Sequence, residues 1–196
     1  MTRIPPVICT LVLAVLASCT GNIVQRDAEA NRIEPRVDPS TLDIDELKDL
    51  TLPAKSLAGQ HVVLPKDLPD QSVLLVLGFT KASRVQTTAW SRRVAQDVRL
   101  SEAIATYHAV FLEDVPALIR GFVTRSIRRS VPKTLRERFL IVTEYTEKWK
   151  KLVSYSQSDA AYLLLLDPMR RVVWRGDGKV ADDSYQALQR AAVKIQ

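Results

Sequence analysis

Short, uninterrupted apolar runs recur along the chain, and each is bounded by glycine, proline or polar residues. Runs of this length with no polar interruption are typical of strands that are buried on both faces of a sheet. They predict four core strands: Val73–Leu77, Tyr107–Leu112, Phe139–Thr143 and Leu163–Leu166.

Between these runs the apolar residues recur every three or four positions, which indicates helices with one buried face. After Gly78, Thr80 and Ser83 offer N-cap side chains for a helix that continues through Trp90 and Val94. The last helix is expected to begin at a cap formed by Asp182 or Asp183. Its buried stripe is expected to contain Tyr185, Leu188, Ala192 and Ile195.

A third helix is predicted between the second and third core strands. Asp114 is the expected cap, Pro116 falls in the first turn, and Pro132 ends the helix. Its apolar residues lie on one face at helical spacing: Leu118, Ile119, Phe122, Val123 and Ile127.

Turn residues indicate two hairpins. Residues 50–68 predict an edge hairpin that turns at Ala58–Gln60, with prolines 53, 65 and 69 keeping its strands short. Leu163–Leu166 and Arg171–Trp174 predict a second hairpin that turns at Asp167-Pro168, followed by a loop at Gly176–Gly178. Residues 147–152 form a short basic segment, and residues 40–47 predict a short helix.

This order of strand, helix and terminal hairpin followed by a helix resembles thioredoxin-like domains. The segment 50–68 is similar to the entry of peroxiredoxin-like and lipoprotein thioredoxin-like domains. The resemblance implies a three-layer α/β/α thioredoxin-like fold with a central mixed sheet over residues 41–196, a length that suits one domain.

The N-terminus resembles a bacterial lipoprotein signal peptide over residues 1–18, with Arg3 before the apolar run Val7–Leu16. This run is shorter than a membrane-spanning helix requires. Leu16-Ala17-Ser18-Cys19 matches the lipobox, so we expect cleavage before Cys19 and transfer of a diacylglyceryl group to its thiol. The resulting anchor is expected to have two or more acyl chains, such as palmitate. The alternative is an ordinary secretory signal. Polar residues 19–40 are expected to form a flexible tether.

Thr20, rather than aspartate, follows the cysteine. By resemblance to the lipoprotein sorting rule, we expect a lipid anchor on the periplasmic face of the cell envelope, in the outer membrane where the organism has one.

The chain has two cysteines, Cys9 and Cys19, so the mature domain is expected to contain neither a free thiol nor a disulfide. Peroxiredoxins place Thr-x-x-Cys, and thioredoxins Cys-x-x-Cys, at the first strand-to-helix junction. Here Thr80-Lys-Ala-Ser83 makes Thr80 and Ser83 a degenerate redox-site position. The peroxiredoxin proline is replaced by Val76, and residues 158–162, which match the thioredoxin proline loop, contain no proline.

Thr80 and Ser83 are interpreted as helix caps. A ligand site at this helix end is an alternative, and a serine nucleophile has no visible base. The two histidines, His61 and His108, have no metal-ligand spacing and no Cys-x-x-x-Cys of the kind that Sco-type copper proteins use. We expect no metal, no cofactor and no catalytic residues.

Basic residues are concentrated in residues 120–138, in a chain of net charge +6 and pI near 9.5. Arg125, Arg128 and Arg129 are a candidate surface for a partner or an anion. The alternatives are an ordinary solvated helix face, anionic lipid headgroups and an acidic protein partner. Nucleic acid is not expected for an exported protein without interleaved aromatic residues.

A further resemblance links Phe79, Trp90 and the hairpin of Leu164–Asp167, Arg171 and Trp174 to the mitochondrial ATP synthase assembly factor family, whose members are thioredoxin-like without the dithiol. The sequence thus predicts a redox-inactive envelope lipoprotein that acts as a binding or assembly module. Two alternatives stay open: a divergent thiol-redox enzyme that depends on a partner thiol, and a membrane-surface module that uses its basic helix. The pattern assigns no oligomeric state.

Overall fold

The computed structural model describes residues 52–195, so the predicted signal peptide, Cys19, the tether and the helix at 40–47 lie outside the described residues. The described chain forms one seven-stranded sheet in the order β2-β1-β5-β4-β3-β6-β7. The neighbours β3, β4 and β5 are parallel, whereas β6, β7 and the β1–β2 hairpin run antiparallel to their neighbours. The sheet is therefore mixed, as expected.

The centre of the sheet is made of the most apolar segments of the chain. β3 (Val73–Gly78) and β6 (Tyr162–Leu166) are buried at every position and pair with each other in register from Val73 with Leu166 to Leu77 with Tyr162. A strand covered on both faces has no position that tolerates a polar side chain, which is why these two runs were recognisable in the sequence.

Less buried strands flank the centre. β4 (Ala105–Phe111) lies beside β3, and β5 (Phe139–Val142) lies beside β4. The expected hairpin consists of β1 (Leu52–Ser56) and β2 (His61–Leu64), with Gly59 in the turn at φ +105°. β1 pairs with β5 only at Lys55 and Ser56, so Pro53 lies where β5 requires no amide donor.

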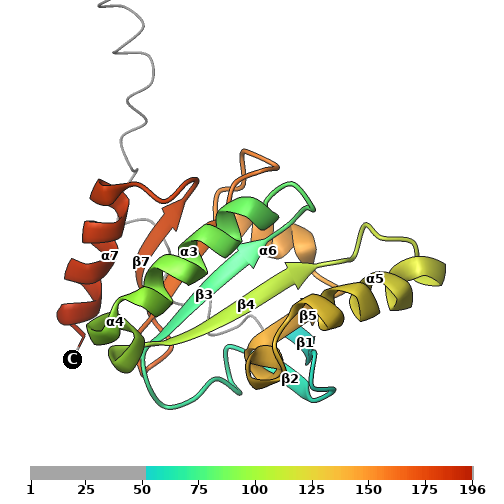
Figure 1. Cartoon of the computed structure of the whole chain (residues 1–196), viewed down its shortest axis with the longest axis horizontal. Helices are drawn as coiled ribbons and strands as arrows, with labels where there is room; N and C mark the ends of the chain where they lie inside the picture. Colours follow the sequence, from blue (N-terminus) through green and yellow to red (C-terminus); the bar gives the residue numbers. More distant parts are fainter. Residues whose placement is uncertain (1–51, 196) are drawn as a thin grey trace, which may run out of the picture. The chain divides into compact units, whose positions relative to one another are not determined.

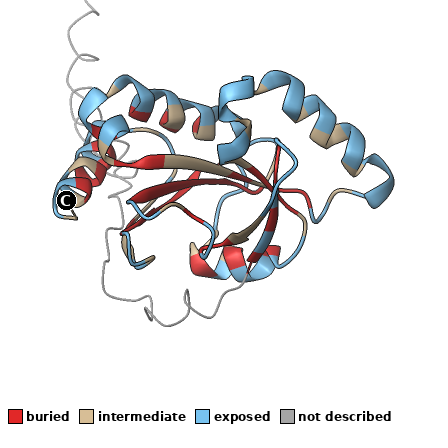
Figure 2. Ribbon diagram, turned by 90° about the horizontal axis from the view of Figure 1, so that it is seen from below, coloured by how far each residue is buried: buried red, intermediate tan, exposed pale blue. Residues whose placement is uncertain are grey.

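Helices cover both faces (Figures 1 and 2). α3 (Arg84–Gln96), α4 (Val98–Ala103) and α7 (Asp182–Val193) pack on the face that carries Leu74 and Val76. α6 (Thr146–Leu152) packs on the other face, against Val73, Leu75 and Leu77. Alternate residues of one strand thus serve two cores, and the three-layer α/β/α prediction is confirmed.

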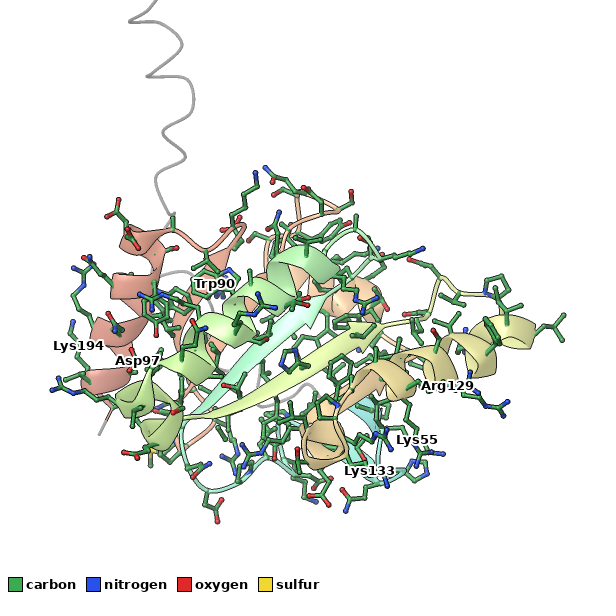
Figure 3. All side chains as sticks on the ribbon, viewed as in Figure 1. Lys55, Trp90, Asp97, Arg129, Lys133 and Lys194 are labelled. Carbon is green, nitrogen blue, oxygen red and sulfur yellow. The ribbon has the colours of Figure 1, made fainter. Side chains whose placement is uncertain are left out.

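Two polar anchors join α3 to the C-terminal part of the chain (Figure 3). Trp90 is fully buried and its Nε1 donates to the carbonyl of Gly178 at 2.9 Å. Asp97, at the α3–α4 corner, accepts from Tyr185 Oη at 2.9 Å and from Gln189 Nε2 at 2.8 Å, both on α7. The expected stripe of α7 is confirmed: Tyr185, Leu188 and Ala192 are buried and Ile195 packs against them.

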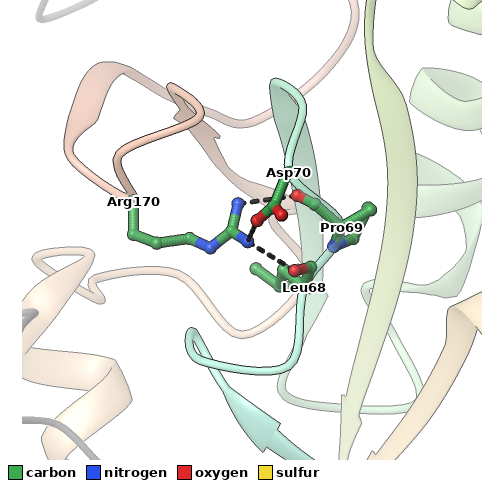
Figure 4. A network of polar contacts seen from close by, with 4 residues as sticks. All are labelled: Leu68, Pro69, Asp70 and Arg170. Carbon is green, nitrogen blue, oxygen red and sulfur yellow. Dashed lines mark hydrogen bonds and ion pairs between the residues drawn. The ribbon is translucent and has the colours of Figure 1, made fainter.

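The turn of the terminal hairpin is also anchored (Figure 4). Arg170 adopts φ +66° and donates to the carbonyls of Pro69 and Leu68 while its guanidinium pairs with Asp70 at 3.0 Å. This contact joins the β6–β7 turn to the segment that leads into β3.

One strand boundary and two helix caps differ from the sequence-based expectation. β7 runs over Val172–Asp177, so Gly176 is not in a loop: it pairs with Leu163, and the Trp174 ring lies over it. α5 (Ala117–Ser130) is preceded by Pro116 as its N-cap residue rather than by Asp114, which is exposed. α7 is preceded by Ala181, whose amide donates to Ser184 Oγ at 3.2 Å, so neither Asp182 nor Asp183 is the cap. In α7 the Ser184 side chain, three residues beyond Ala181, makes the contact that an aspartate cap was expected to make.

Candidate functional site

The turn that joins β3 to α3 contains both residues of the degenerate redox-site position. Thr80 Oγ1 accepts from the amides of Ala82 at 3.1 Å and Ser83 at 3.3 Å, and donates to the carbonyl of Ser158. Ser83 Oγ donates to the Thr80 carbonyl at 2.9 Å and makes no side-chain cap to the helix. The two hydroxyls therefore stabilise the turn, and Ser83 is not the N-cap acceptor that we expected.

Ser83 is only 1% exposed. Its Oγ lies against Gly78, where an added Cβ would be 3.0 Å away. A buried hydroxyl whose proton is held by a backbone carbonyl is neither a thiolate nor an activated nucleophile. This position therefore has a structural role in the described molecule.

The loop that was matched to the thioredoxin proline loop does lie beside this turn. Besides the Thr80–Ser158 bond, Gln86 of α3 accepts from the Ala161 amide at 3.2 Å and donates to Asp159 at 3.5 Å. The loop contains no proline, and the one cis peptide bond among residues 52–195 precedes Pro65. Hydrogen bonds therefore join the loop of residues 158–162 to the β3–α3 turn and to α3.

Aromatic side chains pack next to the β3–α3 turn and the loop of residues 156–161. Phe79 stacks on Phe111 with ring centroids 4.3 Å apart and meets the edges of Tyr155 and Tyr162 at 5.2 and 5.6 Å. Tyr162 Oη accepts from the amides of Ser156 and Gln157. These contacts order the loop of residues 156–161 from below.

The two histidines lie on different strands and form no metal site. His61 is exposed at the start of β2. His108 of β4 stacks on Phe139, and its Nε2 lies 3.0 Å from Ser91 Oγ of α3. Burial lowers the pKa of His108 to about 4, so the ring is neutral at pH 7. Among residues 52–195, no group of three His, Cys, Asp or Glu side chains is placed to hold a metal ion.

Ser91 and His108 were not paired by the sequence analysis. Ser91 Oγ also contacts the Thr87 carbonyl at 2.8 Å, in the pattern of a helical serine that bonds back to the preceding turn. The Ser91–His108 contact links α3 to β4.

The most unusual surface of the described chain is the outer side of α5. Leu118 is 99% exposed, Phe122 73% and Ile119 51%. No residue of α5 is buried, and the residues that pack against the sheet are Val123 and Ile127, which contact the small cluster of Leu57, Leu112 and Ile141. The expected apolar face is therefore split: its second part packs against the sheet, and its first part faces solvent.

The candidate arginines are on the same helix. Arg125, Arg128 and Arg129 are exposed and take part in none of the ion pairs found among residues 52–195. Arg120 differs, because its guanidinium donates to the carbonyls of Glu113 and Val115 and is thus held by the chain. Arg129 and Lys133 lie at the same end of the molecule as Lys55 of β1 (Figure 3). We define the α5 outer surface as Leu118, Ile119, Phe122, Arg125, Arg128 and Arg129.

Comparison with known proteins identifies the fold and leaves the family open. No protein-family model and no curated protein sequence matches the chain. A candidate electron transfer protein from Aquifex aeolicus VF5 superposes with a TM-score of 0.53 at 9% identity, covering 75% of this chain and 94% of that one.

Two other similar structures have TM-scores of 0.48. The exposed lipoprotein thioredoxin of Streptococcus pneumoniae is 10% identical, with coverage of 70% of this chain and 97% of that one. The thioredoxin domain of a thiol-disulfide oxidoreductase from Bacteroides vulgatus is 13% identical, with coverage of 71% and 91%. At these identities the likeness concerns the fold alone, and the fold of the described residues is thioredoxin-like.

No helix among residues 52–195 is both long enough and apolar enough to cross a membrane.

Proposed function

We propose that this chain is a lipid-anchored, redox-inactive thioredoxin-like protein of the bacterial cell envelope that acts as a binding or assembly module. The observation that carries the proposal is the buried Ser83. It occupies the position that matches the peroxiredoxin cysteine, and its hydroxyl donates a hydrogen bond to the Thr80 carbonyl. With Cys9 and Cys19 as the only cysteines of the chain, the domain has no thiol of its own for disulfide exchange.

The anchor is part of this proposal and rests on the lipobox at Cys19. The binding role rests on the α5 outer surface, because three large apolar side chains on one exposed helix are more than a solvated face requires. Partner identity and oligomeric state are outside what these observations assign.

Catalytic assays test the redox part. The purified full chain is expected to reduce neither insulin with dithiothreitol nor hydrogen peroxide above the buffer rate, while a dithiol thioredoxin serves as the positive control. Turnover by the full chain, alone or with an added partner thiol, would support the divergent redox enzyme instead.

Affinity capture tests the binding part. The full chain is captured from a detergent-solubilised envelope, and the control is residues 1–40 of this sequence fused to an unrelated soluble domain. The full chain is expected to retain an envelope component, either lipid or protein, that the control does not retain. Equal recoveries would argue against a binding module.

A further inference from the structure

The outermost line of α5 combines two apolar and two cationic side chains. Leu118, Phe122, Arg125 and Arg129 follow one another at the spacing of four, three and four residues, which places them on one stripe of a helix. The stripe lies opposite Val123 and Ile127, the residues that pack against the sheet. It is therefore the part of the helix that projects farthest into solvent.

The sequence of α5 would form only a marginally stable helix in water on its own. It is 14 residues long, contains Gly121 and several β-branched residues, and buries no side chain completely. Isolated helices of this length are marginal even with better helix formers, and most helical stability in proteins comes from a covered apolar face. α5 leaves Leu118, Ile119 and Phe122 uncovered, so a surface that covers them would stabilise it.

The charged side chains of α5 itself are all cationic. α5 contains no acidic residue, and the following 3₁₀ helix η1 (Lys133–Arg138) contains Glu137 among Lys133, Arg136 and Arg138. None of Arg125, Arg128 and Arg129 is neutralised by an ion pair of residues 52–195. The complementary surface must therefore be both apolar and anionic.

We infer that the α5 outer surface docks on an anionic lipid bilayer. Leu118, Ile119 and Phe122 enter the boundary between headgroups and acyl chains, and Arg125, Arg128 and Arg129 contact lipid phosphates. A bilayer suits a convex helix better than a protein groove does, since it needs no shape complementarity. The inference rests on the proposed function, because the predicted anchor at Cys19 keeps Leu52 within at most about 120 Å of a membrane.

A local fluorescence measurement tests the docking. The full chain carries Cys9→Ser and Cys19→Ala, which remove both cysteines and the acylation site, and then receives Ser126→Cys on α5 for an environment-sensitive fluorophore. A matched chain carries Ser101→Cys on the exposed side of α4. Vesicles are phosphatidylcholine with or without phosphatidylglycerol.

The expected result is a blue shift of the label at position 126 with anionic vesicles, weakened by salt, and no shift at position 101. Arg125→Glu with Arg129→Glu is expected to weaken the vesicle affinity by about tenfold or more, because two attractions become repulsions. Leu118→Ser with Phe122→Ser is expected to abolish the blue shift. Arg92→Glu with Arg99→Glu, at two exposed arginines of α3 and α4, serves as the charge-matched control and is expected to change neither.

Circular dichroism confirms that each variant is folded, so loss of the shift reports docking. Equal shifts at positions 126 and 101, or the same shift with neutral vesicles, would contradict the inference. The chain could instead fail to bind vesicles and capture a protein that Arg125→Glu with Arg129→Glu no longer captures. That result would show that the α5 outer surface binds an acidic protein and not a bilayer. These outcomes leave the redox assays, and hence the proposed function, to be judged separately.

Discussion

His108 and Ser91 form a half-buried polar pair between β4 and α3. The imidazole lies between the ring of Phe139 and the hydroxyl of Ser91, and no carboxylate is among its described contacts. Desolvation is the cause of its lowered pKa, because a charged ring at this position would lose water without gaining an anion. The residue is thus an acid-sensitive point of the fold.

Because of this residue, the free energy of unfolding is expected to decrease as the pH is lowered from 7 toward 4. Above pH 6.5 the ring is neutral in both states. Between pH 6.5 and about 4 the unfolded chain binds a proton at His108 and the folded chain does not, so stability is lost as the pH falls. The loss at this site reaches up to about 3 kcal/mol near pH 4.

Urea unfolding at pH 7 and at pH 5 measures this effect. His108→Gln is expected to flatten the difference between the two pH values, since glutamine does not titrate. His61→Gln, at an exposed residue of β2, is the control and keeps the wild-type difference. If both variants behave alike, another group is responsible for the acid sensitivity.

Ser83 illustrates the same scale in a site that lacks its reactive group. A thiolate at a helix N-terminus is stabilised by the helix dipole, whereas the Ser83 hydroxyl donates away from the helix amides, to Thr80. The Ser83 hydroxyl therefore stabilises the turn before α3.

At the scale of elements, the contacts at helix termini show which of the possible acidic residues caps a helix. Asp97 is the N-cap of α4, accepting from the Leu100 amide at 3.1 Å, and also joins α4 to α7 through Tyr185 and Gln189. The Leu100 amide is the largest cause of the lowered pKa of Asp97, followed by Gln189 and Tyr185. Burial and the neighbouring carboxylate in turn raise the pKa of Tyr185 to about 12.

Asp97→Ala is expected to lower the free energy of unfolding by about 2–3 kcal/mol, from one lost cap and two lost hydrogen bonds. The control is Asp114→Ala. Asp114 precedes α5 at an exposed position and is not its cap, so its removal is expected to change stability by less than about 0.5 kcal/mol. Thermal or urea unfolding of both variants compares the two carboxylates directly, and equal losses would restore Asp114 as a cap.

α5 shows the limit of a helical pattern. The five apolar residues at helical spacing predicted one buried face, yet the sheet covers Val123 and Ile127 and leaves Leu118, Ile119 and Phe122 exposed. Periodicity states which residues share a face, but the neighbour that covers them belongs to another part of the chain or to another molecule.

At the scale of the whole molecule, the described domain and the N-terminal address are separate sources of information. The domain contains a thioredoxin-like sheet with a closed serine site and a basic, apolar helix surface. The address, residues 1–40, lies outside the described residues and rests on the lipobox alone. The proposed envelope role needs both.

Metabolic labelling with palmitate tests the address. In a bacterium that expresses the full chain, the wild type is expected to incorporate palmitate and to fractionate with membranes, because two or more acyl chains form a stable anchor. Cys19→Ala is expected to lose the label. Cys9→Ser, within the signal peptide, is the control and is expected to keep the label as long as the signal peptide still directs export. Labelling that survives Cys19→Ala would favour another lipid site and an ordinary secretory signal.

The buried strands and the lack of cysteine after Cys19 could be predicted from the sequence alone. A strand covered on both faces must be apolar at every position, so the runs within β3 and β6 were visible without any partner. The order of strands and helices could also be predicted locally, because the spacing of apolar residues differs between a strand and a helix. Residues 20–196 contain no cysteine, so this part of the chain has no thiol whatever its fold.

Only the tertiary structure decided how these elements meet. The pairing of Ser91 with His108, the contacts of Asp97 with α7 and the sealing of Ser83 against Gly78 join residues whose approach no local pattern encodes. The exposure of Leu118 and Phe122 likewise follows from the packing of α5 through Val123 and Ile127. Such contacts depend on the packing of distant segments, because burial is a property of the surroundings of a side chain and not of the side chain itself.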